Sequence, residues 1–457
     1  MMKPLRRSAP LLVTALMALV AGPGTGGANV PRQEKRIITR AALRQPVARI
    51  RAQGLSPRSR FRGYAADRVL VRFKPEVGDA TADAVLKMYE FPSVHRIPGI
   101  GAYAVRIPAG ATVPETLALL RRNPDVELAR PDYPARLADV PNDPYFLNYQ
   151  YALSNRGGIL NVSPDIRPQM TAGADIKAVD AWTATKGDAG TIIAILDTGV
   201  DKTHPDLAGK VLDGYDFAND DNDADDDVWH GTHVAGIAAA GTNNTVGTAG
   251  VAWNCRILPV KVTDGNGDGY YSWIIDGIIY AADHGAAVIN ISLGGSVDDP
   301  LLKQACQYAH DKGVVIAAAA GNDGTLGVLY PAAYDGEVLA VAASDYNDAI
   351  TSFSSYGPEV DVAAPGMWVL AAAPQWYVGD GYLPYLFGTG TSMASPHVAG
   401  MAALLKSAKP DLGPDDLMKL IRYTADDINK TTYPGRDDHA GYGRINMARA
   451  LTPYILK

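Results

Sequence analysis

The sequence predicts an α/β fold with a doubly wound, mostly parallel sheet flanked by helices, preceded by a smaller unit that also combines strands and helices. Three observations lead to this prediction. Short, continuously apolar runs recur after residue 142, and helical stretches separate them. Of 457 residues, 47% are hydrophobic and 20% are charged, which is a globular composition. Apolar runs without polar alternation are typical of strands that are covered on both faces.

The large sheet is expected within residues 142–457, which we treat as one domain. Its predicted strands are 192–196, 257–262, 287–291, 314–319 and 338–341. Strands that alternate with helices in this way form parallel sheets. The carboxyl ends of parallel strands meet at one edge, where such folds bind their ligands.

A smaller unit is expected over residues 67–135. Its predicted strands are 68–73, 102–107 and 126–129, and its predicted helices are 80–90 and 113–122. Prolines at 131, 134 and 141 follow, so we place a junction between the two units at residues 136–141.

The first 66 residues are predicted to be a signal peptide and a leader. Residues 1–28 begin with basic residues, continue with the apolar run 11–21 and end in small residues, as export signals do. The run is too short for a stop-transfer helix, and a buried N-terminal helix is the alternative. Residues 29–66, here called the leader, are rich in Arg and are expected to be flexible. We therefore expect a secreted protein that has no membrane contact after signal removal.

Charge is distributed unevenly along the chain. Residues 1–62 carry 13 Lys and Arg against one acid, whereas residues 142–457 carry 19 basic and 38 acidic residues, 36 of them Asp. A domain this acidic is a poor binder of phosphate backbones, so nucleic acid is excluded as a partner. It suits hard cations, which take oxygen ligands. The two cysteines, Cys255 and Cys306, are expected to be packed free thiols, because two cysteines cannot form a disulfide framework.

Two segments could carry acid–base chemistry. Asp197 ends a buried strand, where it could act at the sheet edge or cap the next helix. His230 opens an apolar helix that also contains His233. The pair lacks the glutamate of the zinc-protease motif. His230 could therefore be a general base, while a packed core histidine is the alternative.

Two further segments could supply a nucleophile and an oxyanion donor. Ser392 stands where the Gly-rich stretch 388–390 runs into a helix, whose N-terminus favours negative charge. Ser395 is its competitor, but it lies one turn further into the helix, where packing is expected. Asn322 follows the apolar strand 314–319 and could donate to an oxyanion or serve only as a turn residue.

Together, in the order Asp, His, Asn, Ser, these motifs make the chain resemble the subtilisin-like serine peptidases. Within that family its sequence is similar to the thermitase-like members. The resemblance covers most of residues 142–450 and includes the ending 441–446. It implies that Ser392 is the nucleophile, His230 the base and Asp197 the group that orients the base. Asn322 and the Ser392 amide would form the oxyanion hole. It also implies that 67–135 is a ferredoxin-like α+β propeptide, which assists folding, inhibits the enzyme and is removed by self-cleavage.

The resemblance further implies a polypeptide substrate that binds as an added strand in a monomeric enzyme. The residues implied for the substrate cleft are Gly267, Asp268, Gly269, Ser292, Leu293, Gly294, Asp323 and Leu329. Asp323 could favour basic side chains, although a broad apolar preference is the main expectation. Trp229 departs from the family pattern, which has a small residue before the histidine, and is expected to alter access to the base.

Calcium is the expected cofactor, with no organic cofactor. One implied site consists of the side chains of Asp143, Asp206 and Asn244 and the carbonyls of Thr242, Val246 and Thr248. A second possible site is the loop 213–227, which contains eight Asp; its implied ligands are Asp216, Asp221, Asp223 and Asp225. A solvated acidic loop is the alternative there.

Two other functions stay open at this point. One is a catalytically silent binding or scaffold protein of the same fold. The other is a processing peptidase that cuts at basic sites.

Overall fold

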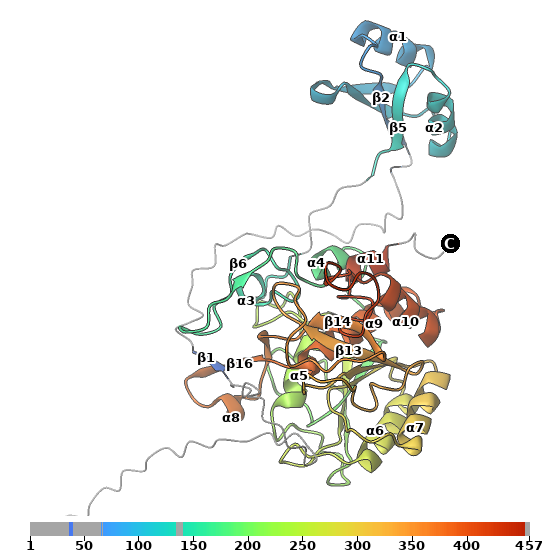
Figure 1. The fold of residues 1–457 in the computed structure, drawn as a ribbon. Helices are drawn as coiled ribbons and strands as arrows, with labels where there is room; N and C mark the ends of the chain where they lie inside the picture. The colour runs from blue at the N-terminus through green and yellow to red at the C-terminus, as the bar shows by residue number, and fades with distance from the viewer. Residues whose placement is uncertain (1–35, 40–64, 66, 134–139, 453–457) are drawn as a thin grey trace, which may run out of the picture. The chain divides into compact units, whose positions relative to one another are not determined.

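The computed structural model describes residues 36–39, 65, 67–133 and 140–452 (Figure 1). The chain divides into two compact units, one of residues 48–137 and one of residues 1–47 and 138–457. The predicted signal peptide, most of the leader and most of the junction 136–141 lie outside the described residues.

The smaller unit is a four-stranded antiparallel sheet with two helices, in the order β-α-β-β-α-β of ferredoxin-like folds. In the sheet the strands are ordered β3-β4-β2-β5. The elements are β2 (Arg68–Phe73), α1 (Asp79–Met88), β3 (Ser93–Ile97), η1 (Pro98–Ile100), β4 (Ala102–Arg106), α2 (Val113–Arg121) and β5 (Val126–Pro131). Strand β3 was not predicted, and the other strands and the helices lie where the sequence places them. Val69, Val105 and Leu120 are fully buried in its core.

The larger unit is built on a seven-stranded parallel sheet with the order β14-β13-β12-β11-β8-β10-β9. This confirms the predicted fold class. The strands are β8 (Ile192–Asp197), β9 (Tyr215–Asp216), β10 (Arg256–Lys261), β11 (Val288–Ile291), β12 (Val315–Ala319), β13 (Val338–Ser344) and β14 (Val360–Pro365). Successive side chains along each strand point to opposite faces of the sheet, and a hydrophobic core covers each face. Consecutive residues of a strand are therefore both apolar.

Helices cover both faces of this sheet (Figure 1). On one face Ile193 and Ile195 pack with α5 (His230–Ala239), α9 (Thr391–Ala408), α10 (Pro414–Tyr423) and α11 (Met447–Leu451). On the other face Ala194 and Leu196 pack with α6 (Tyr271–Asp283) and α7 (Pro300–Asp311). Cys255 and Cys306 are buried free thiols, one in each core, as expected.

A hairpin lies beside the sheet and leads into α9. It consists of β15 (Val369–Ala372), α8 (Gln375–Val378) and β16 (Tyr382–Gly388). On its other side β16 pairs with β1 (Arg36–Thr39), a strand of the leader that the sequence analysis did not predict. The remaining elements are α3 (Phe146–Tyr149), β6 (Gly158–Ile159), β7 (Gln169–Met170) and α4 (Ala178–Ala181). Among the described residues, no helix is both long and apolar enough to cross a membrane.

Candidate active site

Asp197 and His230 meet at the carboxyl edge of the sheet. Asp197 ends β8 and His230 begins α5, and Nδ1 of His230 lies 2.7 Å from Oδ1 of Asp197. Burial lowers the pKa of His230, but the charge and hydrogen bond of Asp197 outweigh burial, so that the pKa is raised overall. With Nδ1 turned to the carboxylate, Nε2 of the imidazole is left to exchange protons.

Two glycines allow this close approach of strand and helix. A Cβ atom on Gly231 would lie 2.0 Å from the carbonyl oxygen of Gly199. Gly199 has φ +98°, and its own Cβ would lie 2.4 Å from the carbonyl oxygen of Asp225. Larger residues at either position would therefore push the turn that carries His230 away from Asp197.

Asp226 fixes the same turn through five hydrogen bonds. Its Oδ1 accepts from the Thr198 hydroxyl (2.8 Å) and from the N–H groups of Val228 (3.0 Å) and Trp229 (2.8 Å). Its Oδ2 accepts from the N–H (2.9 Å) and hydroxyl (2.6 Å) of Thr232. Burial raises the pKa of Asp226 to about 6, and these donors favour the ionised form that they bind. The sequence analysis missed Asp226 because it is one Asp among the eight of the acidic loop.

Ser392 and Asn322 lie at the start of α9 and just beyond β12. The Ser392 hydroxyl donates to the carbonyl of Ser292, 2.9 Å away, and the Ser292 hydroxyl donates to the carbonyl of Ser392, also at 2.9 Å. Oδ1 of Asn322 accepts from the N–H (2.8 Å) and the hydroxyl (3.0 Å) of Thr391. The amide NH2 of Asn322 therefore faces away from Thr391. β12, β11 and β8 are neighbours in the sheet, so Asn322, Ser292 and Asp197 lie at or just beyond the ends of three adjacent strands.

The competing residues of the same motifs point into the protein. The Ser395 hydroxyl donates to Oδ1 of Asn290 at 2.8 Å. His233 and His397 are buried, with ring nitrogens 3.1 Å from the Leu386 carbonyl and 2.9 Å from the Met393 carbonyl. Burial lowers the pKa of His233 to about 3 and that of His397 to about 4. Both imidazoles are therefore neutral at physiological pH.

The residues expected to line the cleft occupy loops at this edge. Gly269 forms an antiparallel bridge with Thr263, in the loop that also contains Gly267 and Asp268. A Cβ on Gly294, which follows Ser292 and Leu293, would lie 2.6 Å from the Tyr330 carbonyl. Near Asn322, the Asp323 N–H donates to the Ser355 hydroxyl at 3.3 Å, and the Leu329 N–H donates to the Ala320 carbonyl at 3.0 Å.

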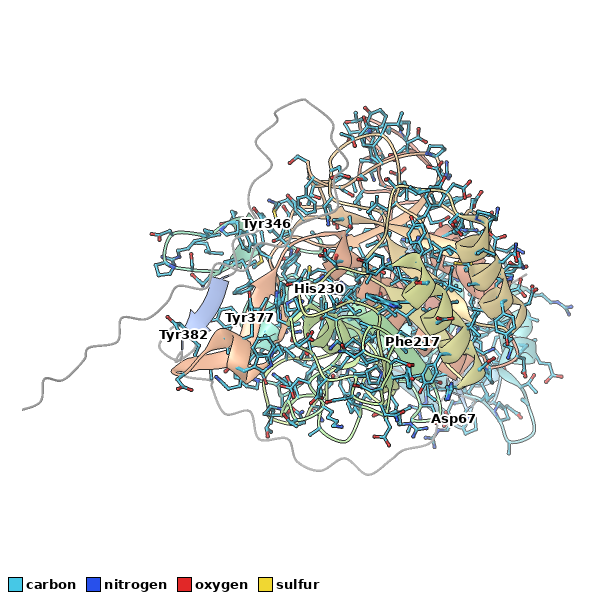
Figure 2. All side chains as sticks on the ribbon, turned by 90° about the horizontal axis from the view of Figure 1, so that it is seen from below. Asp67, Phe217, His230, Tyr346, Tyr377 and Tyr382 are labelled. Carbon is cyan, nitrogen blue, oxygen red and sulfur yellow. The ribbon has the colours of Figure 1, made fainter. Side chains whose placement is uncertain are left out.

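Trp229, the departure from the family pattern, turns its ring inward and is 4% exposed. It stacks on Tyr377 of α8, with ring centroids 5.5 Å apart, and meets His230 edge-on at 5.6 Å. Figure 2 labels both Tyr377 and His230. The ring therefore links the base to the hairpin of β15 and β16.

The residues of the first implied calcium site come together, although they are far apart in sequence. The Asp143 carboxylate accepts the N–H groups of Asn243 (2.8 Å) and Asn244 (3.2 Å). Asp206 accepts from the Asn244 amide (3.1 Å) and the Thr248 N–H (2.7 Å). Burial, with the charge of Asp143 added, raises the pKa of Asp206 to about 6.

Two neighbouring, largely buried carboxylates fit a bound cation, which would offset their mutual repulsion. The predicted carbonyl ligands of Thr242, Val246 and Thr248 belong to the same loop. No group of three or more His, Cys, Asp or Glu side chains that could hold a metal occurs in the part of the chain that the structure describes. A complete shell here would thus depend on amide and backbone oxygens.

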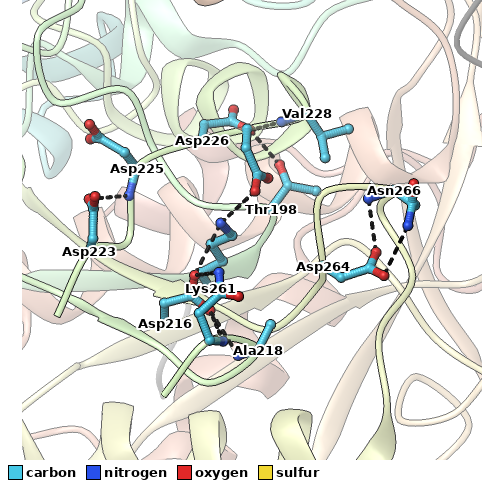
Figure 3. A network of polar contacts seen from close by, with 12 residues as sticks. Thr198, Asp216, Ala218, Asp223, Asp225, Asp226, Val228, Lys261, Asp264 and Asn266 are labelled. Carbon is cyan, nitrogen blue, oxygen red and sulfur yellow. Dashed lines mark hydrogen bonds and ion pairs between the residues drawn. The ribbon is translucent and has the colours of Figure 1, made fainter. Parts of the chain in front are cut away.

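A buried lysine at the end of β10 pairs with two aspartates of the acidic loop (Figure 3). Nζ of the buried Lys261 lies 3.1 Å from Asp216 and 2.7 Å from Asp227. Asp221, Asp223 and Asp225 are linked by short turns, in which the Asp223 N–H donates to Asp221 and the Asp225 N–H to Asp223. Lys261 already balances part of the negative charge at Asp216. The two residues are 45 positions apart in the sequence, so this ion pair depends on the fold.

Comparisons with known proteins agree with this geometry. Residues 188–443 match the family model of the subtilase family, and residues 56–132 match that of the fervidolysin N-terminal prodomain. The chain is 43% identical over 389 residues to a thermophilic serine proteinase of Bacillus sp. (strain AK1), covering 85% of this chain and 88% of the relative. It is 45% identical over 313 residues to thermitase of Thermoactinomyces vulgaris, covering 68% of this chain and 99% of thermitase.

A solved protease structure from Pseudoalteromonas arctica PAMC 21717 also matches, with a TM-score of 0.58 and 34% identity, over 68% of this chain and 98% of the other. The family model spans more than half of the chain, and it includes Asp197, His230, Asn322 and Ser392. The resemblance stated from the sequence is therefore confirmed: this chain belongs to the subtilase family of serine proteinases and carries a fervidolysin-like N-terminal prodomain.

Proposed function

We propose that this subtilase is a secreted endopeptidase that is made as a self-processing precursor and cleaves peptide bonds through an acyl-enzyme. The observation that carries the proposal is the 2.7 Å contact between His230 and Asp197 at the sheet edge where Ser392 and Asn322 also lie. Ser392 would attack the substrate carbonyl while His230 accepts its proton. In the state described here the Ser392 hydroxyl donates to the Ser292 carbonyl, so this hydrogen bond must break before the proton passes to His230.

Asp197 would keep the imidazole in the tautomer whose Nε2 accepts the proton, and would stabilise the imidazolium. The Asn322 amide, which is oriented by Thr391, and the Ser392 N–H would donate to the oxyanion. The protonated His230 would then give its proton to the leaving amine, and water would hydrolyse the acyl-enzyme by the same steps in reverse order.

Calcium is proposed as a structural ligand at Asp143, Asp206 and Asn244, with the carbonyls of Thr242, Val246 and Thr248. A cation bound there would join residue 143, which lies just after the proposed junction, to the body of the domain. The loop of Asp216, Asp221, Asp223 and Asp225 remains a weaker candidate, because Lys261 already pairs with Asp216.

The proposed activity is tested by labelling with a serine-directed fluorophosphonate. We expect one label per wild-type molecule, located at Ser392, and no label in the Ser392→Ala variant. Ser395→Ala is the matched control and should still be labelled, because its hydroxyl is bonded inside the protein. An unlabelled wild-type protein would favour the silent binding protein. Cleavage of a peptide library would then distinguish a broad endopeptidase from one that cuts at basic sites.

A further inference from the structure

The hairpin that precedes Ser392 has an outer edge that binds another strand. In this hairpin β16 pairs with β15 on one side and with β1 on the other, both in antiparallel orientation. Cα partners across the β1–β16 pair are Arg36 with Phe387, Ile37 with Leu386, and Thr39 with Tyr382. Figures 1 and 2 show the blue strand β1 beside the orange hairpin that carries Tyr377 and Tyr382. Within the larger unit, β16 would be an edge strand without β1.

The inner face of the same hairpin supports the active site. Leu386 is fully buried in a cluster with Trp229 and Met393, the neighbours of His230 and Ser392. The Leu386 carbonyl lies 3.1 Å from a ring nitrogen of His233. Only three residues separate the end of β16 from Ser392. A strand that binds the outer edge of β16 therefore pairs with the backbone that supports both catalytic groups.

The chemistry of the leader matches this edge. An exposed edge strand offers unpaired N–H and C=O groups, which an extended peptide can satisfy. Residues 37–39 are Ile, Ile and Thr, all β-branched and favourable in strands. Residues 1–62 carry 12 net positive charges and residues 142–457 carry 19 net negative charges, so the two segments also attract each other.

We propose that the outer edge of β16 is a docking site for the leader segment Arg36–Thr39, through which the pro-region is held to the mature domain. Docking itself needs no peptidase activity. Its consequence for maturation rests on the proposed function: a segment that is still docked after the junction is cut keeps the pro-region at high effective concentration and slows its release.

The first test measures hydrogen–deuterium exchange in the full-length Ser392→Ala precursor. The double variant Ile37→Pro with Ile38→Pro removes two successive N–H donors. Because neighbouring N–H groups of a strand point to opposite sides, one of the two points at β16. Amides of residues 382–387 should exchange about tenfold faster or more in this variant, which corresponds to about 1.4 kcal/mol or more. The control Ile37→Val with Ile38→Val keeps strand propensity and should leave exchange unchanged. Equal exchange in all three proteins would overturn the proposal.

A second test uses disulfide cross-linking in the same Ser392→Ala precursor. Thr39→Cys with Tyr382→Cys places the thiols on residues that are Cα partners across the two strands, and such partners usually lie within the range that a disulfide bridges. Thr39→Cys with Tyr423→Cys is the control, because Tyr423 is exposed but lies on α10. Selective cross-linking to position 382 is expected, and equal yields would contradict docking. Hydrogen exchange and cross-linking both use the Ser392→Ala precursor, so neither depends on peptidase activity. If the proposed function is wrong, wild-type protein will not be labelled by the fluorophosphonate, and the two docking tests will be unaffected.

Discussion

At the scale of single residues, the protonation of His230 is controlled by two carboxylates. Asp197 bonds directly to its ring, and the charge of Asp226 also favours the imidazolium, so the pKa of His230 is raised despite burial. A general base must be neutral to accept a proton. Activity should therefore be lost as pH falls through a pKa that lies above the ordinary histidine value of about 6.5.

Replacing Asp226 by Asn removes one of these charges and keeps the side-chain shape. The pKa of His230 should fall, and the acidic limb of the kcat/KM profile should shift to lower pH. Asp213→Asn is the matched control, because Asp213 is an exposed residue of the same loop. The measurement is kcat/KM against pH for the three proteins. An acidic limb that stays in place in Asp226→Asn would mean that Asp226 acts only on the backbone of the turn.

The oxyanion role of Asn322 gives a second prediction at this scale. Asn322→Leu keeps the branched shape of the side chain but removes the amide NH2, which would stabilise the negative charge that develops on the carbonyl oxygen only in the transition state. We expect kcat to fall by about 10²–10³, as for the equivalent subtilisin donor, while KM changes little. Steady-state kinetics on a peptide substrate measure both constants. A loss confined to KM would assign Asn322 to substrate binding instead.

At the scale of elements, five of the seven parallel strands were predicted from sequence, whereas β9, β14 and the hairpin were not. Residues 192–196 form one continuous apolar run, as a strand buried on both faces requires. Strand β16 contains Pro384 and mixes aromatic with aliphatic residues, so its pattern does not indicate a strand. Strand β3 is equally difficult to predict, because His95 and Arg96 stand in the middle of it and break the apolar pattern. Contacts such as Lys261 with Asp216 depend on the fold and leave no local signal.

The loop of residues 242–248 carries the calcium prediction. Asp143 and Asp206 both bind its backbone, and a cation there stabilises only the folded arrangement. At a hundredfold excess of ligand over its Kd this contributes about 2.7 kcal/mol. Chelation should lower the temperature of thermal inactivation, and calcium should restore it where magnesium, which demands smaller and more regular shells, does not.

The matched variants for this loop are Asp206→Ala and Asp213→Ala. Asp206→Ala should lose most of the calcium response, whereas the exposed Asp213→Ala should keep it. Residual activity after heating, with calcium and with chelator, gives the inactivation temperatures. If wild-type protein inactivates at the same temperature in both, residues 143, 206 and 244 hold no stabilising ion.

At the scale of the whole molecule, the chain joins a basic leader, a small folded unit and an acidic peptidase domain. The fervidolysin-like prodomain match ends at residue 132, and the boundary between the two units falls between residues 137 and 138, within the proposed junction 136–141. If Ser392 performs the cleavage, Ser392→Ala should fold but stay at precursor length after signal removal, with processing reduced on the order of 10⁶-fold. Mass spectrometry of the purified protein measures the length. Ser395→Ala should still mature, since its hydroxyl is buried against Asn290. A Ser392→Ala protein that matures to a start near residues 137–142 without added protease would show that the cut depends on another nucleophile.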